Sequence, residues 1–341
     1  MTTRPQARID RVTLIVSDLH QAEIDYVKTF GCSIEQRDDV DASLARLLRI
    51  PRTRGRRSVL RLGRERIELL EFTEAGGRSY PLGSTSTDLW FQHMAIVVND
   101  MRQAYLRVMA NRRFRPNSRD APVRLPDDSG GVSAFKFRDH DGHPLELPAF
   151  PEGQVPESWR TGNGTGSFLG VDHTAIAVSD PAGSARFFGS VFGFSTGTHT
   201  ENRGPEQVHL DGVHVSVTRL APDLPAPRME LLRYHVGTRR PIPHDTASND
   251  IAATHSMVRV ASLEATASAL ARRGTPLAHD DLMTLQEGIR AALVPGPDRH
   301  RFLAEEQAGL TPKPRRAPGR SAPARRRRQG PACRWPRWSR R

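Results

Sequence analysis

Four short segments of the sequence carry a basic side chain at the same place in a repeated pattern. Arg11, His93, His173 and His255 recur at intervals of 82, 80 and 82 residues. Each is followed by β-branched and small residues, a composition typical of a β-strand. Imidazole nitrogens are common metal ligands, whereas a guanidinium keeps its charge and cannot coordinate a metal. Three of the four positions can therefore serve a metal site, and Arg11 is suited to a carboxylate or phosphate.

Carboxylates recur with the same regularity. Glu68 and Glu230 stand in matching segments, Ile-Glu-Leu-Leu and Met-Glu-Leu-Leu, at an offset of 162 residues. The same offset relates Arg11 to His173. An internal repeat of this kind indicates duplicated structural units. Each half of the chain is therefore expected to supply its own set of basic and acidic side chains.

The segments around these residues predict the elements that position them. Asp18, Asp100 and Asp180 follow three of the first strands, and Asp there is a helix N-cap signal. After each expected helix come alternating strand patterns. In the second unit, residues 134–147 contain two such patterns joined by Asp-Gly, a strong hairpin signal. Each unit is therefore expected to be βαβββ, repeated four times in an α+β fold.

These patterns resemble the vicinal oxygen chelate superfamily, whose members include glyoxalase I, extradiol dioxygenases and bleomycin resistance proteins. The resemblance covers residues 7–308 and rests on the four units, on FQHMAIVVNDM and VDHTAIAVSDP as first strands, and on RDHDGHPLEL as a closing pattern. It implies that the units pair into two cups of curved sheet, each able to hold a divalent metal. We expect units one and two to form the first cup, and units three and four the second.

The resemblance implies that the second cup holds the metal through His173, Glu230 and His255. In unit four the corresponding last-strand position is Leu303, where the extradiol pattern has Glu. Glu305 lies two residues further on and faces the same side of a strand, so a small register shift would bring it in. Such ligands suit Fe²⁺, Mn²⁺, Ni²⁺, Co²⁺ or Zn²⁺.

The first cup carries Arg11 in place of a metal ligand. Its other expected residues are Glu68, His93 and Glu146. An Arg facing two carboxylates can replace the cation electrostatically, so we expect a salt-bridged cup without metal. The alternatives are a metal bound by the remaining ligands, or Arg11 binding a substrate carboxylate or phosphate.

The implied function is that of a metal-dependent enzyme acting on a small oxygen-chelating substrate. Glyoxalase-type lyase or isomerase chemistry and extradiol-type ring cleavage both fit. Glu230 would act as a ligand or as a base, and Tyr234 as an acid or hydrogen-bond donor. The alternative is a protein that binds a small molecule without chemistry, like the bleomycin resistance proteins. Metal content separates the two, because the binding protein needs none.

The expected domain plan follows the repeat. Residues 7–150 form the first domain and 169–308 the second. The linker 151–168 is rich in Pro, Gly, Ser and Thr, and 309–341 form a Pro- and Arg-rich tail. The tail has almost no aliphatic residues and cannot bury enough apolar surface to offset the entropy of ordering, so we expect it to be disordered.

The tail also explains the charge. The chain has 50 Lys and Arg against 38 Asp and Glu, a net charge of +12, and Lys313 with eleven Arg places all of it in residues 311–341. Nucleic acid is therefore expected as a partner only through the tail.

No run of about 18 apolar residues is present and the N-terminus lacks an apolar signal core, so we expect a cytoplasmic protein without a membrane span. The two cysteines make neither a disulfide framework nor a zinc site.

A chain that ends at Leu310 is expected to fold with an unchanged melting temperature and a near-neutral isoelectric point. The reason is that the tail holds the net charge but no core pattern. Thermal unfolding of the two chains side by side checks this. A loss of more than a few degrees in the shorter chain would show that the tail packs on the body.

Overall fold

The computed structural model describes residues 7–51, 53–73, 77–117, 121–125, 130–160, 166–203, 214–222, 227–235 and 237–307. The predicted tail lies outside these residues. Within them, no helix has the length and apolar character needed to cross a membrane.

The four predicted βαβββ units are present. Unit one comprises β1 (Ala7–Ile15), α1 (Leu19–Phe30), β2 (Ser33–Asp39), α2 (Ala42–Leu47), β3 (Gly55–Leu62) and β4 (Glu65–Phe72). Unit two comprises β5 (Gln92–Val98), α3 (Met101–Ala110), β6 (Arg115–Pro116), β7 (Val123–Arg124), β8 (Ser133–Arg138) and β9 (Pro144–Ala149). The short helix α4 (Glu157–Arg160) follows.

The second half repeats this order. Unit three comprises β10 (Phe168–Ala177), α5 (Pro181–Val191), β11 (Ser195–Arg203), β12 (His214–Ala221) and β13 (Arg228–Tyr234). Unit four comprises β14 (His255–Val260), α6 (Leu263–Ala271), β15 (Leu282–Thr284), β16 (Arg290–Pro295) and β17 (Arg301–Glu306). Single 3-10 turns lie at Ile251–Ala253, His279–Asp281, Gln286–Gly288 and Pro297–Arg299.

The helix starts form as the sequence predicts. The carboxylates of Asp18, Asp100 and Asp180 each accept a hydrogen bond, at 3.0 Å, from the backbone N–H three residues on. In unit four the hydroxyl of Ser262 takes this role at 3.1 Å. Each cap satisfies one of the unpaired N–H groups of a first helical turn. In all four units the helix thus begins at an equivalent capping residue, just after the first strand.

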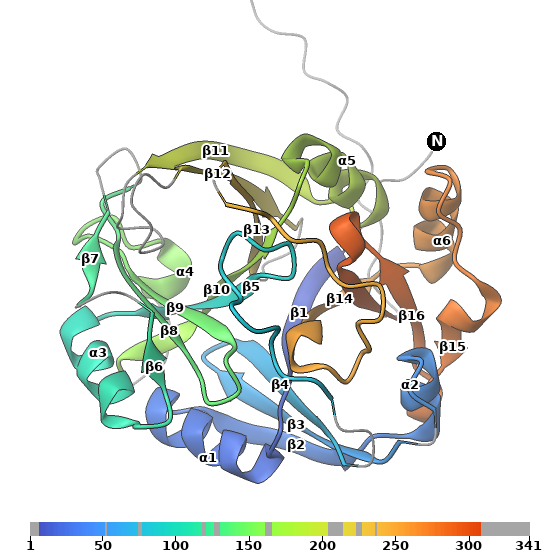
Figure 1. Cartoon of the computed structure of the whole chain (residues 1–341), viewed down its shortest axis with the longest axis horizontal. Helices are drawn as coiled ribbons and strands as arrows, with labels where there is room; N and C mark the ends of the chain where they lie inside the picture. The colour runs from blue at the N-terminus through green and yellow to red at the C-terminus, as the bar shows by residue number, and fades with distance from the viewer. Residues whose placement is uncertain are drawn as a thin grey trace, which may run out of the picture.

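The strands form two sheets, and each sheet takes one unit from each half of the chain. One sheet has the order β15-β16-β17-β14-β1-β4-β3-β2, and the other has the order β11-β12-β13-β10-β5-β9-β8-β6. The joints are antiparallel pairs of first strands, β1 with β14 and β5 with β10. We call the two concave sides the one–four cup and the two–three cup, after the units that build them (Figure 1).

The expected pairing of unit one with unit two, and of unit three with unit four, is therefore wrong for the sheets. The reason lies in the apolar cores. Units one and two share a core between their helices and sheets, in which Tyr26 and Phe30 of α1 meet Phe135 and Phe137 of β8. Units three and four share another, built around α5 and α6. Each half thus buries its helices within itself, which leaves its first-strand edges free to pair with the other half.

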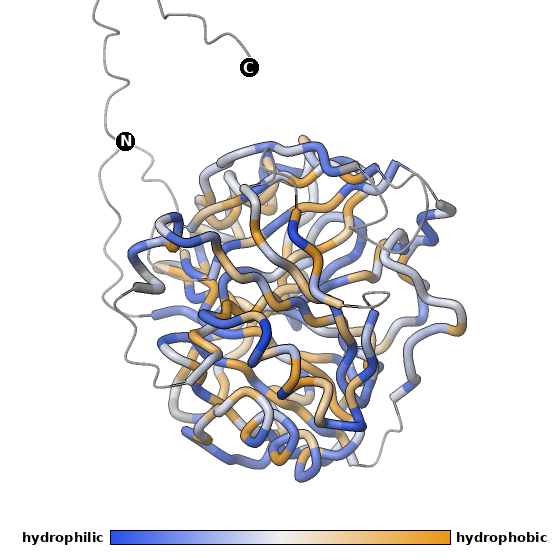
Figure 2. Tube along the Cα trace, turned by 90° about the vertical axis from the view of Figure 1, so that its left-hand side faces the viewer, coloured by the Kyte–Doolittle hydropathy of each residue, from blue (hydrophilic) through white to orange (hydrophobic). Residues whose placement is uncertain are grey.

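The interior of the body is apolar, as this arrangement requires. Figure 2 shows the hydrophobic stretches of the chain concentrated inside the body. In Figure 1, α1 and α3 lie on one side of the sheets, and α5 and α6 lie on the opposite side. The two sheets therefore stand between two helix-bearing cores.

A reciprocal pair of ion pairs also joins the halves. Arg78 of the first half binds Asp250 of the second, with Nη2 and Oδ2 2.8 Å apart. Arg240 of the second half binds Asp88 of the first, at 2.7 Å. The two pairs are related by the 162-residue offset, so each duplicate supplies the partner that the other needs. Asp88 is fully buried, which makes its arginine partner structurally important.

A second buried ionic group lies under α1. Asp139 accepts hydrogen bonds from Nδ1 of His143 at 2.8 Å and from the hydroxyl of Tyr26 at 3.0 Å. Burial favours the neutral imidazole, but the Asp139 carboxylate outweighs it and raises the pKa of His143 above 6.5. Burial likewise opposes ionisation of Asp139, but His143 outweighs it and lowers the pKa of this carboxyl below 3.8.

This pair predicts a pH dependence of stability. The Asp139 contribution is present above pH 3.8 and is lost as pH falls through its lowered pKa. The His143 contribution is present below pH 6.5 and is lost as pH rises through its raised pKa. We therefore expect the difference in unfolding free energy between the wild type and His143→Gln to be largest between these values. Urea unfolding across the pH range measures it, and a difference that does not vary with pH would contradict the prediction.

Candidate metal centre

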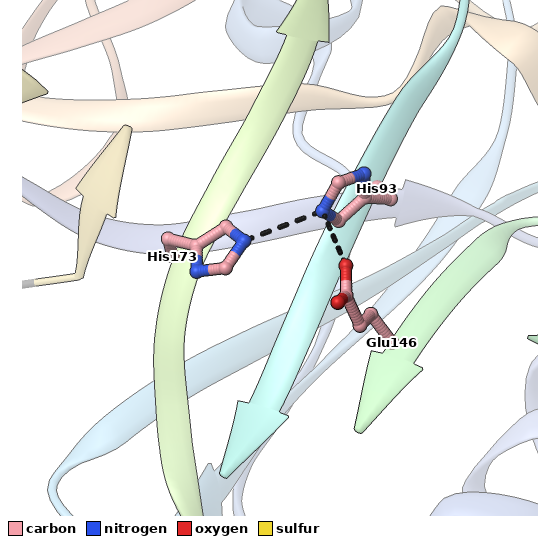
Figure 3. Close-up of side chains that lie close together, drawn as sticks. All are labelled: His93, Glu146 and His173. Carbon is pink, nitrogen blue, oxygen red and sulfur yellow. Dashed lines mark hydrogen bonds and ion pairs between the residues drawn. The ribbon is translucent and has the colours of Figure 1, made fainter. Parts of the chain in front are cut away.

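Three strands of the two–three cup bring two imidazoles and a carboxylate together. In the register of the sheet, Ala175 of β10 lies opposite His93, and Ala95 of β5 lies opposite both His173 and Glu146. Side chains directly opposite one another point to the same face of a sheet, so all three side chains project into the cup. Figure 3 shows them converging from β5, β9 and β10.

The contacts are short. Nε2 of His93 lies 3.3 Å from Nε2 of His173 and 3.2 Å from Oε2 of Glu146. On the other side of the pair, Oε2 of Glu230 lies 3.5 Å from Nε2 of His173. The set of four is His93, Glu146, His173 and Glu230.

Neighbouring residues orient this set. Nδ1 of His173 donates to Oδ2 of Asp172 at 2.8 Å, and Asp172 is in turn held by Arg228. A bulge in β10 between Val171 and His173 places Asp172 beside the imidazole. When the ring is neutral and Nδ1 carries the donated proton, the lone pair is on Nε2 and faces the other ligands. Burial favours this neutral form, but Glu230, Asp172 and Glu146 outweigh it and raise the pKa of His173 above 6.5, so binding of a metal must displace the Nε2 proton. A carboxylate behind a histidine is a common support for metal ligation.

The electrostatics of the set are strongly perturbed. Burial lowers the pKa of His93 below 6.5, and Glu146 only partly offsets this effect. Burial opposes ionisation of Glu146, but Lys136 and His93 outweigh it and hold the pKa of this carboxyl far below its usual range. Lys136 lies 3.6 Å from Glu146. Neutral His93 and ionised Glu146 are the forms that bind metals.

The donor set fits a divalent transition metal. With metal–nitrogen and metal–oxygen bonds of about 2.0–2.2 Å, neighbouring ligand atoms stand roughly 3.0–3.5 Å apart. The separations of 3.2, 3.3 and 3.5 Å found here lie in that range. Two imidazoles with carboxylates suit Fe²⁺, Mn²⁺, Co²⁺, Ni²⁺ or Zn²⁺. His93, Glu146 and His173 would hold the ion, because their ligand atoms all lie within 4.8 Å of one another, and Glu230 lies beside His173 at the edge of this group.

The set lines a cavity of about 110 Å³ in the two–three cup. Val217, Leu232 and Tyr234 form part of its apolar wall. Burial raises the pKa of Tyr234, so its hydroxyl, which is hydrogen-bonded to the side chain of Ser86, keeps its proton. Arg219 also lines the cavity, and its Nε donates to Oε1 of Glu230 at 2.9 Å. The cavity thus offers an apolar wall, a phenol and a carboxylate beside the imidazoles.

The one–four cup contains an arginine cluster. Nη2 of Arg11 lies 3.0 Å from Glu305, its Nε lies 3.2 Å from Glu68, and its Nη1 lies 3.3 Å from Asp10. Burial disfavours a charged guanidinium, but these carboxylates outweigh it and raise the pKa of Arg11. Glu68 also accepts a hydrogen bond from Thr13 at 2.7 Å. Arg11 therefore supplies the positive charge that these buried carboxylates need.

The chain itself fills the rest of this cup. Leu44 and Leu47 of α2 belong to one apolar cluster with Leu70, Met257 and Leu303 on the concave face of the sheet. The residue opposite Met257 is Leu303, just as Glu146 stands opposite Ala95. Leu303, which takes the position that Glu146 has in the other cup, is thus part of an apolar core.

The structure divides the predicted metal set between the two cups. His173 and Glu230 lie in the two–three cup, whereas His255 and Glu305 lie in the one–four cup. The expectation that His173, Glu230 and His255 converge is therefore wrong, because their strands belong to different sheets. Likewise, the predicted neighbours of Arg11 separate: Glu68 stays with it, whereas His93 and Glu146 join the other cup.

Sequence reasoning overlooked three residues that surround the set. These are Lys136, Asp172 and Arg219. A signal for Asp172 exists, because Asp172 precedes His173 just as Asp10 precedes Arg11 at the 162-residue offset. A signal for Arg219 exists too, because Arg57 stands at the same offset and contacts Glu68 as Arg219 contacts Glu230. Lys136 carries no comparable signal.

A second group of histidines lies on the outer strands of the same sheet. Glu201 pairs with His199, at 2.8 Å, and with His214, whose ring stacks on that of His235 with centroids 4.0 Å apart. Glu201, His214 and His235 offer ligand atoms close enough to share an ion. Because this group is more exposed than the His93 set, measurements of metal content need to separate the two.

Several solved structures have a similar fold. Glyoxalase I from Zea mays matches with a TM-score of 0.62 and 16% identity, over 89% of this chain and 93% of that one. A Bacillus subtilis protein described as a dioxygenase matches with a TM-score of 0.57 and 13% identity, over 89% and 86% of the two chains. At the level of sequence, no family model and no curated protein matches. At these identities the likeness establishes the fold.

Proposed function

Because the chain has the fold of the vicinal oxygen chelate superfamily, we propose that it is a metal-dependent enzyme whose active site is the two–three cup. From the resemblance to that superfamily we infer that its substrate is a small molecule with two adjacent oxygens. The observation that carries the proposal is the group of two imidazoles and one carboxylate whose ligand atoms lie within 4.8 Å of one another at a cavity, with Glu230 beside His173.

A divalent metal held there would polarise the substrate oxygens as a Lewis acid. The chain supplies the remaining functions. Glu230 is oriented by Arg219 and lies at the edge of the set, where its carboxylate can accept a proton from a carbon next to a carbonyl. Tyr234 provides a protonated hydroxyl in the same cavity. These groups favour proton transfer of the glyoxalase type, as in a lyase or isomerase, over ring cleavage.

The second candidate function is binding of a small molecule without metal or chemistry. The observation that favours it is Lys136, whose ammonium lies 3.6 Å from Glu146 and can neutralise this carboxylate internally. In that case the cup would bind its ligand through Lys136, Arg219 and the apolar wall. The two candidates differ in metal content and in turnover.

Two measurements test the proposed enzyme. Elemental analysis of the purified full chain, before and after reconstitution with Fe²⁺, Mn²⁺, Co²⁺, Ni²⁺ or Zn²⁺, determines whether metal binds. Proton transfer is measured by NMR as exchange of the α-proton of an α-hydroxyketone in deuterated buffer. Ring cleavage is measured as consumption of a catechol in the presence of Fe²⁺ and oxygen. We expect exchange in the wild type and none in Glu230→Gln. Ligand binding without bound metal or turnover would support the binding protein instead.

A further inference from the structure

A second cavity, which we call the junction cavity, lies where the two halves meet. It has a volume of about 530 Å³, within the size range of small-molecule sites. None of the Arg11 cluster and none of the His93 set lines it. Residues from both halves and from the turn before β17 form its wall, among them Trp90, Ile242, Ala253, Pro295, Arg299 and Arg301.

One part of the wall is apolar. Trp90, Ile242, Ala253 and Pro295 come from three separate segments of the chain. The indole N–H of Trp90 is already used, since it donates to Ser84 at 3.1 Å, and Arg240 stacks on the ring at 4.7 Å. The lining of this region thus suits the hydrocarbon body of a ligand.

The other part of the wall is cationic. Arg301 donates to the hydroxyl of Ser248 at 2.9 Å and to the carbonyl of Thr246 at 3.3 Å, and both of these acceptors are neutral. Arg299 donates to the carbonyl of Ile242 at 3.2 Å. Over the described part of the chain, neither guanidinium has a carboxylate within ion-pair distance. Both guanidinium groups line the cavity, and the carboxylates that act on Arg301, Asp281 and Asp250, do so from beyond ion-pair distance.

The remaining ionisable groups of the wall do not cancel this charge. Asp250 is neutralised by Arg78, at 2.8 Å, and also accepts from two backbone N–H groups. His300 donates from Nε2 to the carbonyl of Ala177 at 2.9 Å, and burial lowers its pKa, which keeps the ring neutral. Burial, together with Arg49 and Arg299, lowers the pKa of Arg301, as expected where positive charge is in excess.

We propose that the junction cavity is a binding site for a small amphipathic carboxylate. The carboxylate pairs with Arg301, with Arg299 nearby, and the apolar body packs against Trp90 and Ile242. A planar guanidinium matches a carboxylate with two parallel hydrogen bonds, which an uncharged head group cannot reproduce. This site is independent of the proposed enzyme function, since it shares no residue with the two–three cup.

Calorimetric titration of the full chain with 4-phenylbutyrate and with its neutral counterpart 4-phenylbutanol tests the proposal. The two probes have the same apolar body and differ in charge. We expect the carboxylate to bind the wild type at least about tenfold more tightly than the alcohol. Arg301→Gln should remove most of this preference, whereas His173→Ala, in the two–three cup, should leave it unchanged.

Ala253→Phe provides a second variant, because the added ring occupies part of the cavity and should weaken both probes. If this variant does not fold, Arg301→Gln and the pair of probes still decide the question. Quenching of indole fluorescence that is present in the wild type and absent in Trp90→Phe would place the ligand at this wall. The proposal is overturned if neither probe binds at millimolar concentration, if both bind equally, or if His173→Ala abolishes the preference.

Discussion

His93→Ala and His173→Ala are each expected to abolish binding of a divalent transition metal, whereas His255→Ala is expected to leave it intact. The two imidazoles face each other at 3.3 Å in the two–three cup. His255 lies in the other cup, where Nδ1 bonds the carbonyl of Ala253 at 3.3 Å. Removing one ligand should exceed the roughly 10–100-fold loss of affinity that follows removal of a residue orienting a ligand.

Asp172→Asn is the graded comparison, because it keeps every ligand and weakens the support behind His173, and it also removes the ion pair with Arg228. We expect about a 10–100-fold weaker affinity for this variant. His214→Ala serves as the control for the exposed histidine group and should not change the ion in the cup. Calorimetry with Zn²⁺ and Ni²⁺ measures all five variants. If His255→Ala lost the metal and His93→Ala kept it, the ion would lie outside the two–three cup.

Arg11→Ala is expected to cost about 3–5 kcal/mol of unfolding free energy, the usual effect of breaking a buried ion pair from one side. The guanidinium is almost fully buried and is shared by Glu68, Glu305 and Asp10. Its removal leaves two buried carboxylates, Glu68 and Glu305, without their nearest cation. Urea unfolding at neutral pH measures the loss.

Arg66→Ala is the matched control. Arg66 contacts the same Asp10 at 3.6 Å, but its side chain is 34% exposed. Water screens such a pair, so we expect a loss of at most about 1 kcal/mol. Equal effects of the two substitutions would mean that Arg11 does not neutralise the cluster. Recovery of the Arg11→Ala stability at low pH would support the explanation, since protonated carboxylates need no counter-ion.

The sequence alone predicted the local structure of this protein. Caps at Asp18, Asp100 and Asp180 depend on contacts within one helical turn. The hairpin through Gly142 depends on a positive φ of 93° that glycine adopts readily. The internal repeat identified which positions are equivalent, and thus which side chains stand on first and last strands. All of these features depend on neighbours in the sequence or on the comparison of one segment with another.

Only the tertiary structure decided which of these positions meet. The repeat shows that His93 is equivalent to His255, and that equivalence does not determine which strand lies beside which. The first strands are apolar along most of their length, so their pattern allows either pairing. The choice followed from burial of the helices within each half, which exposed the edges of β5 and β10 to one another. The same choice placed His255 with Arg11 and separated it from His173.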